Sequence, residues 1–421
     1  MRVRASRLRA LAAASTAALT LLTACGGGGY SSDNASAGGG RTNGVTLKVL
    51  IGSSGDTETK AVQAAGDAWG AKTGNTVQVT AAKDVTQELA QALAGGSPPD
   101  MFYVDAAKFA GLQKANALAP YFDQLPNKGD FYPNLVKSFT ADGKAYCAPK
   151  DFSTLALEIN TDMWTKAGLT DADLPKTWDQ LETVAKKLTA GGVTGLVVSD
   201  TLDRLNAFML GAGGSLMIAD STAFTADSPE TLAGLQYVQK LAKEGALQFP
   251  KQVDSGWGGE ALGKNKAAMT IEGNWIVGGV KTDYPNLKYR TVELPAGPKA
   301  QATLSFTNCW GVAQKSANQA AAVDFVKFLT TADQQLAFAK AFGVMPSVKS
   351  AQDQFVAQFP DQKAFVAGGA YAVGPVSVPG FDAVKKDFDS KVIGLSNGSS
   401  DPMAMLSALQ KNAAAALAQA K

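Results

Sequence analysis

Residues 45–105 alternate between strand-like and helical segments, and this alternation constrains the fold more than any other feature of the chain. The strand-like segments are 45–51, 76–80 and 100–105, and the helical segments between them are 57–72 and 84–93. Connections of this kind indicate parallel βαβ units, and strands and helices keep alternating to the C-terminus, so we expect an α/β fold. Ligands of such sheets bind beyond the carboxyl ends of the strands, where Ser53, Ser54 and Asp105 lie.

Length and composition exclude several classes of function. A chain of 421 residues is too long for one ordinary core, so two or three domains are expected. The net charge is +2 and no basic patch follows the N-terminus, so nucleic acid is not an expected partner. The chain has no histidine, which removes the commonest acid–base group, nucleophile partner and metal ligand. We therefore expect no metal and no cofactor, although catalysis by carboxylates alone stays open.

Residues 1–25 have the features of a lipoprotein signal peptide. Four arginines among the first nine residues precede an apolar run, 10–22, that is shorter than the roughly 20 residues of a membrane span. The run ends in Leu-Thr-Ala-Cys25, which resembles a lipobox, the motif whose cysteine is acylated and anchors bacterial lipoproteins. Residues 26–44 are rich in Gly, Ser, Asn and Ala, as in a flexible tether. The prediction is an extracytoplasmic protein anchored to the outer face of the cell membrane by a lipid on Cys25.

The two other cysteines, Cys147 and Cys309, form an even pair in an oxidising compartment. A disulfide between them is one interpretation. Two separate buried thiols, each acting as a small apolar side chain, are the other.

Tryptophans accompany polar residues at expected loop positions. Trp257 follows Asp-Ser-Gly, Trp275 follows Glu-Gly-Asn and Trp310 follows Asn-Cys. A sugar ring has an apolar C–H face that an indole can cover and a rim of hydroxyls that Asp, Glu, Asn and Arg can bind. These tryptophans therefore indicate a neutral polyhydroxylated ligand, with burial in the core as the alternative.

Several short motifs, taken in order, resemble those of the extracellular solute-binding proteins of carbohydrate ABC transporters, the family of maltose-binding protein. The motifs are the turn 97–100 with the strand to Asp105, segment 143–151, segments 160–164 and 167–169, segment 175–178, and segment 263–269 leading to 272–275. The resemblance implies a two-lobe periplasmic-binding-protein fold of type II, with discontinuous lobes joined by hinge strands. The N-lobe would comprise residues 45–150 plus 307–350, and the C-lobe residues 151–306 plus 351–421.

The resemblance also implies the positions of the ligand-binding residues in a cleft between the lobes. Ser53, Ser54 and Asp105 would line the N-lobe side, Asp151 and Ser153 the hinge floor, Trp257 and Trp275 the C-lobe side, and Asp203, Asn274, Asn308 and Phe381 would add weaker contacts. Trp275 would be the stacking platform. Many family members have small residues at the positions of Cys147 and Cys309, on hinge strands that run side by side, and this predicts a disulfide between them.

The function implied is capture rather than catalysis. The protein would bind a sugar or small oligosaccharide as a monomer and deliver it to the transmembrane subunits of an ABC importer. One alternative is a secreted glycoside hydrolase, with Asp105 and Asp151 as its carboxylate pair. Another is a receptor for a non-sugar solute such as a polyamine.

Overall fold

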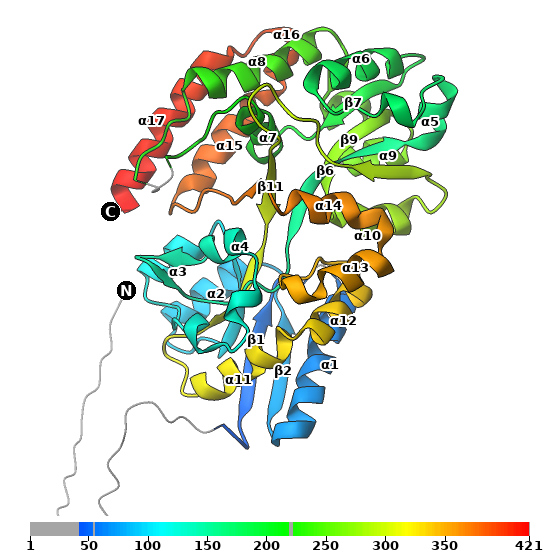
Figure 1. Cartoon of the computed structure of the whole chain (residues 1–421). Coiled ribbons are helices and arrows are strands. Elements are labelled where there is room, and N and C mark those ends of the chain that lie inside the picture. Colours follow the sequence, from blue (N-terminus) through cyan, green and yellow to red (C-terminus); the bar gives the residue numbers. More distant parts are fainter. Residues whose placement is uncertain (1–41, 54, 219–221, 421) are drawn as a thin grey trace, which may run out of the picture. The chain divides into compact units, whose positions relative to one another are not determined.

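The strands form two large sheets, each of which organises one lobe. The computed structural model describes residues 42–53, 55–218 and 222–420. The first sheet has the order β12-β3-β1-β2, the second has the order β13-β11-β6-β9-β7-β8 with β10 also paired to β6, and β4 and β5 form a small hairpin (Figure 1). The strands are β1 (Thr46–Ile51), β2 (Thr76–Ala81), β3 (Met101–Asp105), β4 (Thr140–Ala141), β5 (Lys144–Ala145), β6 (Ser153–Asn160), β7 (Thr194–Val198), β8 (Leu247–Gln248), β9 (Ala267–Gly273), β10 (Tyr289–Val292), β11 (Thr303–Phe306), β12 (Asn308–Val312) and β13 (Ala372–Val373).

The first sheet confirms the βαβ pattern read from the sequence. Strand β1 pairs in parallel with both β2 and β3, and β12 adds an antiparallel edge to β3. Helix α1 (Asp56–Thr73) connects β1 to β2, and α2 (Val85–Ala94) connects β2 to β3. Local signals set the helix ends: Gly74 closes α1 in the left-handed conformation, and the Asp84 side chain accepts a hydrogen bond from the Gln87 amide at the start of α2.

The second sheet has β6 at its centre. Every residue of β6 is buried, and the strand pairs antiparallel with β9, β10 and β11. Strand β7 runs parallel to β9 and to β8, so β7 and β9 have their carboxyl ends at one edge of the sheet.

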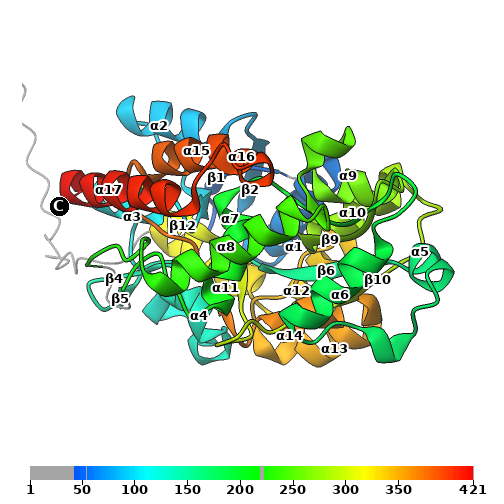
Figure 2. The ribbon, with the colours of Figure 1, turned by 90° about the horizontal axis from the view of Figure 1, so that it is seen from above.

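Helices cover both sheets (Figures 1 and 2). Besides α1 and α2 they are α3 (Phe109–Lys114), α4 (Pro133–Lys137), α5 (Thr161–Lys166), α6 (Trp178–Leu188), α7 (Leu202–Gly211), α8 (Pro229–Lys243), α9 (Gly258–Gly263), α10 (Trp275–Asp283), α11 (Gln319–Leu329), α12 (Ala332–Phe342), α13 (Gln352–Gln358), α14 (Lys363–Gly368), α15 (Phe381–Val392), α16 (Gly394–Asn397) and α17 (Pro402–Ala420). Short 3₁₀ turns lie at Phe122–Gln124, Lys128–Asp130, Asp171–Asp173, Pro250–Val253, Lys349–Ala351 and Pro360–Gln362. Helix α17 packs beside α15 and α8 (Figure 2). No helix within the described ranges is both long and apolar enough to cross a membrane.

The chain passes between the two sheets three times: before β6, at Thr307 between β11 and β12, and between β12 and β13. Segment 303–313, strand-like in sequence, divides at Thr307: β11 belongs to the second sheet and β12 to the first. The stretch before β6 bridges to the same region, with the Lys150 amide donating to the Asn308 carbonyl (2.8 Å), and Phe152 bridges to Met345. The lobe boundaries expected at 150/151, 306/307 and 350/351 fall close to these crossings and stay predictions.

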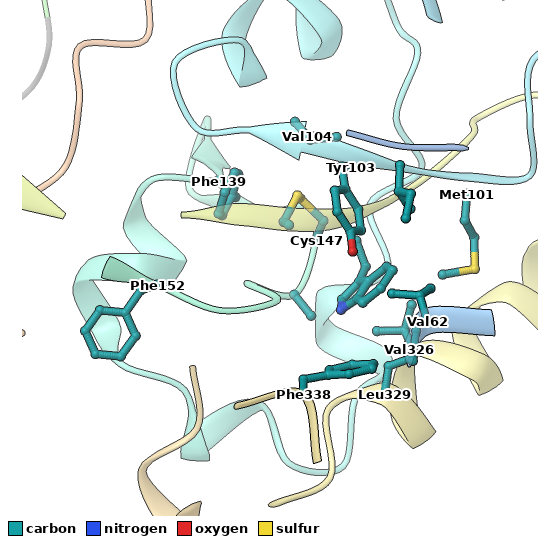
Figure 3. Close-up of a cluster of buried hydrophobic side chains, with 14 of the residues drawn as sticks. Val62, Met101, Tyr103, Val104, Phe139, Cys147, Phe152, Val326, Leu329 and Phe338 are labelled. Atoms are coloured by element: carbon teal, nitrogen blue, oxygen red, sulfur yellow. A yellow bond between two sulfur atoms is a disulfide. The ribbon is translucent and has the colours of Figure 1, made fainter. Parts of the chain in front are cut away.

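The disulfide expected from the family resemblance is present. Cys147 and Cys309 are bonded, with their Cα atoms 5.8 Å apart. Both residues are buried in the first-lobe core, where Figure 3 shows Cys147 among side chains that include Tyr103 and Phe139. The backbone of the next turn supports the pairing, since Pro149 bridges to Cys309. The expected signal peptide, Cys25, most of the tether and Ser54 lie outside the described residues.

Candidate ligand-binding site

A pocket of about 470 Å³ lies at the carboxyl ends of β7 and β9. Its wall is formed by Ser199, Asp200, Thr201, Arg204, Gly256, Trp257, Glu272, Trp275 and Gly279. The chain leaves β7 through residues 199–201 into α7 and leaves β9 through Gly273 into α10. Because the two strands are parallel, both exits meet at one edge of the sheet, which is where α/β proteins bind ligands.

Glu272 organises the polar wall of this pocket. Its Oε1 accepts a hydrogen bond from Ser199 Oγ (3.0 Å), and its Oε2 accepts from Arg204 Nη2 (2.7 Å) and from Trp275 Nε1 (3.1 Å). The Glu272 side chain is about 1% exposed, and the guanidinium of Arg204 balances its charge. One carboxylate therefore sets the orientation of three pocket residues, as expected for a preorganised binding surface.

A second carboxyl group, Glu158, lies behind Glu272. It is fully buried on β6, and its Oε2 accepts the backbone amide of Glu272 (3.1 Å). Burial raises the pKa of Glu158 well above its usual range, and the nearby charge of Glu272 raises it further. Burial beside Glu272 therefore disfavours the charged form of Glu158.

The aromatic wall consists of two indoles. The Arg204 guanidinium lies over the Trp275 ring, 4.9 Å from its centroid, and Phe306 meets that ring edge-on at 5.3 Å. Trp275 is 38% exposed, unusually high for a large aromatic side chain, and Trp257 is half-buried. The pocket therefore combines aromatic faces with charged and hydroxyl groups.

Glycines let both indoles lie against the backbone. A Cβ atom on Gly273 would stand 2.2 Å from the Trp275 ring, and one on Gly259 would stand 2.1 Å from the Trp257 ring. Any larger residue at either position would displace the ring. The Gly-Gly and Glu-Gly-Asn-Trp sequences around these tryptophans are thus explained by ring placement.

Of the residues predicted from the sequence, Trp257 and Trp275 line the pocket. Asp203 is one residue from the wall but forms an ion pair with Lys385 (2.5 Å). Asn274 and Ser153 are largely buried and bind each other, the Asn274 amide donating to Ser153 Oγ (2.9 Å), and Asn274 Nδ2 donates to the Gly343 carbonyl (2.8 Å).

Asp151 has surroundings that the sequence did not predict. Its carboxylate is buried and forms an ion pair with Lys150, whose Nζ also binds Glu58 Oε1 (3.1 Å). The Lys150 ammonium lies 4.6 Å from the centre of the Tyr103 ring, and Tyr103 donates to the same Glu58 oxygen (2.9 Å). Burial lowers the pKa of Lys150, but Asp151 and Glu58 more than offset it and raise that pKa, so Lys150 stays charged. Asp151 thus belongs to a buried charge cluster beside the crossing segments.

The other predicted residues lie elsewhere. Phe381 is buried in the second-lobe core and stacks on Phe224 at 5.5 Å. Asp105 is exposed at the end of β3 and accepts the Ala107 amide (2.8 Å), and Asn308 is half-buried on β12. Ser53 Oγ accepts from Thr59 Oγ1 (2.9 Å). None of these four residues lines the pocket described above.

Sequence reasoning missed Ser199, Asp200, Thr201, Arg204 and Glu272 as wall residues. A signal for the first three was available, because they directly follow the strand-like segment 195–198. Arg204 carried no such signal, since it lies within a helix. Among the described residues, no group of three or more metal-ligating side chains comes together.

Residues 64–367 match the family model of the bacterial extracellular solute-binding proteins. The chain belongs to this family. This solute-binding protein is 26% identical to the diacetylchitobiose binding protein DasA of Streptomyces coelicolor, over 72% of this chain and 73% of that protein. It is 30% identical to a probable ABC transporter-binding protein of Deinococcus radiodurans, over 64% of this chain and 68% of that protein. These relatives are binding proteins rather than enzymes.

Solved structures share the two-lobe fold of this solute-binding protein. The cyclic α-maltosyl-1,6-maltose binding protein of Arthrobacter globiformis superposes with a TM-score of 0.79 at 21% identity, covering 89% of this chain and 99% of that one. The Listeria monocytogenes substrate-binding protein solved with cycloalternan gives 0.75 at 21% identity, covering 88% and 98%. At these identities the likeness establishes the fold, which confirms the expectation of a maltose-binding-protein-like architecture.

Proposed function

We propose that this solute-binding protein captures a sugar or small oligosaccharide and delivers it to the transmembrane subunits of an ABC importer. The observation that carries the proposal is the pocket, where the exposed Trp275 indole lies beside the Glu272–Arg204 pair. An indole face suits the C–H face of a pyranose, and a paired carboxylate and guanidinium suit its hydroxyls. The ligands of these relatives agree with this chemistry: DasA is a diacetylchitobiose binding protein, the Arthrobacter protein binds cyclic α-maltosyl-1,6-maltose, and the Listeria protein was solved in complex with cycloalternan.

Capture would involve closure of the two lobes over the ligand. Contacts already connect them: Lys108 forms an ion pair with Asp382, and the Ala110 amide donates to Ser377 Oγ (3.1 Å). A ligand that binds the closed form better than the open form shifts the population toward closure. The predicted residues Ser53 and Asp105, at the carboxyl ends of β1 and β3, would then complete the site from the first lobe.

The lipid anchor is part of the same proposal. Acylation of Cys25 would hold the protein on the outer face of the membrane, and the tether would raise its effective concentration near the importer. Expression with a radiolabelled fatty acid tests the anchor: label in the wild-type protein and none in a Cys25→Ala variant is the expected result.

Titration calorimetry tests the sugar site. Maltose, maltotriose and N,N′-diacetylchitobiose are titrated into the protein and into Trp275→Ala. We expect at least one sugar to bind the unmodified protein and its affinity to fall about fivefold or more in the variant, because loss of an aromatic contact costs about 1 kcal/mol or more. The melting temperature of the variant is the control for the fold, because Trp275 also contacts Phe306 and donates to Glu272. Binding without cleavage of the sugar distinguishes this function from a glycoside hydrolase, and undiminished affinity in Trp275→Ala would contradict the site.

A further inference from the structure

The first turn of α7, which forms one wall of the pocket, is capped by a distant carboxylate. Thr201 occupies the N-cap position in an extended conformation, where a threonine side chain ordinarily accepts a hydrogen bond from the helix's own amides. Its side chain makes no such bond. Asp389 Oδ1, on α15, accepts the amide of Leu202, the first residue of the helix (2.6 Å), across 187 positions of sequence.

The Thr201 hydroxyl is not used by its own helix. Thr201 Oγ1 is buried, has no hydrogen-bond partner within the described part of the chain, and belongs to a residue of the pocket wall. Burying a hydroxyl without a partner is unfavourable, so an unpaired group beside a cavity points to a ligand atom.

A second unused donor lies in the same turn. Arg204 Nε is buried without a partner among the described residues, although Nη2 of the same guanidinium binds Glu272. Helix α15 makes a second contact with the first turn of α7, since Lys385 on α15 forms an ion pair with Asp203 (2.5 Å). Helices α7 and α15 pack against each other in the second lobe (Figure 1). Two contacts from α15 therefore fix a turn whose pocket-wall residues carry two buried polar atoms without a partner among the described residues.

We propose that Asp389 and Lys385 are positioning residues that fix the first turn of α7 at the pocket, and that the Thr201 hydroxyl, which its own helix does not use, binds the ligand together with Arg204 Nε. The ligand groups that match are oxygen acceptors, such as sugar hydroxyls or an acetamido carbonyl. This inference rests on the proposed function for its ligand and on the helix geometry for its cap.

The charges around Asp389 agree with this role. Asp203 and Asp200 face it from the α7 side and Lys385 faces it from its own helix. Burial raises the pKa of Asp389 to about 6, with the Leu202 hydrogen bond and Lys385 opposing the rise and the two aspartates adding to it. Above this pH the group is an ionised acceptor, the stronger form for an amide at a helix N-terminus.

Hydrogen exchange of the Leu202 amide tests the cap without any ligand. We expect Asp389→Ala to speed this exchange at least tenfold at pH 7.5. Asp389→Asn, which keeps an oxygen acceptor, should retain most of the protection. Asp387→Ala is the matched control, because Asp387 lies on the same helix and pairs with Lys391 (2.7 Å). Unchanged Leu202 exchange in Asp389→Ala, or equal acceleration in Asp387→Ala, would overturn the assignment of the cap.

A double-mutant cycle tests the coupling to the ligand. Calorimetry with maltose and N,N′-diacetylchitobiose compares the wild type with Thr201→Val, Asp389→Ala and the double variant. We expect each single change to weaken binding at least fivefold, Thr201→Ser to restore it, and the double variant to bind about as weakly as Asp389→Ala, because the turn that holds Thr201 at the pocket is then no longer fixed. Wild-type affinity in Thr201→Val, or strictly additive losses, would refute the coupling. If neither sugar binds the wild type, the proposed function fails and the role of Thr201 toward a sugar fails with it, while exchange at Leu202 still decides the cap.

Discussion

Removal of the Cys147–Cys309 disulfide should destabilise the protein by several kcal/mol. The bond joins residues 162 positions apart in the sequence. In the chain-entropy model, closing a loop of this length in the unfolded chain contributes about 5 kcal/mol at 25 °C. Measured values are usually lower, because the unfolded state retains structure, so we expect a loss of about 2–5 kcal/mol.

The location of the disulfide determines how far its removal should lower the melting temperature. Both cysteines are at most 1% exposed and lie within the first-lobe core, so the double variant Cys147→Ala/Cys309→Ala also loses some packing. For a folding unit of about 150–250 residues, each kcal/mol shifts the melting temperature by about 2–4 °C. We therefore expect the melting temperature to fall by roughly 5–15 °C.

Calorimetry on the purified protein, with and without a thiol reductant, provides the measurement. The wild type should melt lower once it has been unfolded and refolded in reductant, and the double variant should not respond to reductant at all. Sugar binding serves as the control for native structure in the variant. The reasoning is refuted if both thiols of the unreduced native protein react with iodoacetamide, or if the double variant melts within about 1 °C of the wild type.

Three further changes test the packing and the charges. Lys150→Met removes the cation that pairs with two buried carboxylates, so the free energy of unfolding should fall by about 3–5 kcal/mol at pH 7 and by less at pH 4.5, where carboxylates protonate; equal losses in urea titrations at both pH values would contradict this. Gly195→Ala would place a Cβ atom 1.9 Å from the Ala185 carbonyl and should lower the melting temperature markedly, whereas Gly111→Ala, with open space around the added atom, should not; similar melting curves would count against the packing described. Because the pKa of Asp389 is raised to about 6, the stability contributed by its protonated form is complete below pH 4 and lost as pH rises through 6. Asp389→Asn should therefore gain about 1 kcal/mol relative to the wild type between pH 4 and pH 7, after allowance for solvent screening, and a pH-independent difference in urea titrations would exclude the titration.

Much of the first lobe could be predicted from local sequence. The five elements from β1 to β3 lie within a few residues of the expected positions, because apolar periodicity, Gly74 and the Asp84 cap act over short distances. Trp257 and Trp275 could also be identified, since an aromatic residue among glycines and acids is visible in a single short segment.

Residues that depend on distant partners could not be identified in this way. Asp151 follows Lys150 in the sequence, but its burial depends on Glu58 and Tyr103, which come from the first lobe's helix and strand. The Thr303–Ala313 segment has one continuous strand pattern, yet the two sheets divide it at Thr307. The hydrophobic pattern of a segment does not show which of two sheets its residues join.

The sequence by itself determined the alternation of strands and helices in the first lobe and the family to which the chain belongs. Only the tertiary structure decided which side chains meet in the pocket at the carboxyl ends of β7 and β9. Glu272 pairs with Arg204 across 68 positions, and Asp389 caps Leu202 across 187. The physical reason is range: backbone conformation follows from neighbouring residues, whereas the charge and hydrogen-bond partners of a pocket follow from long-range packing of the sheet and its helices.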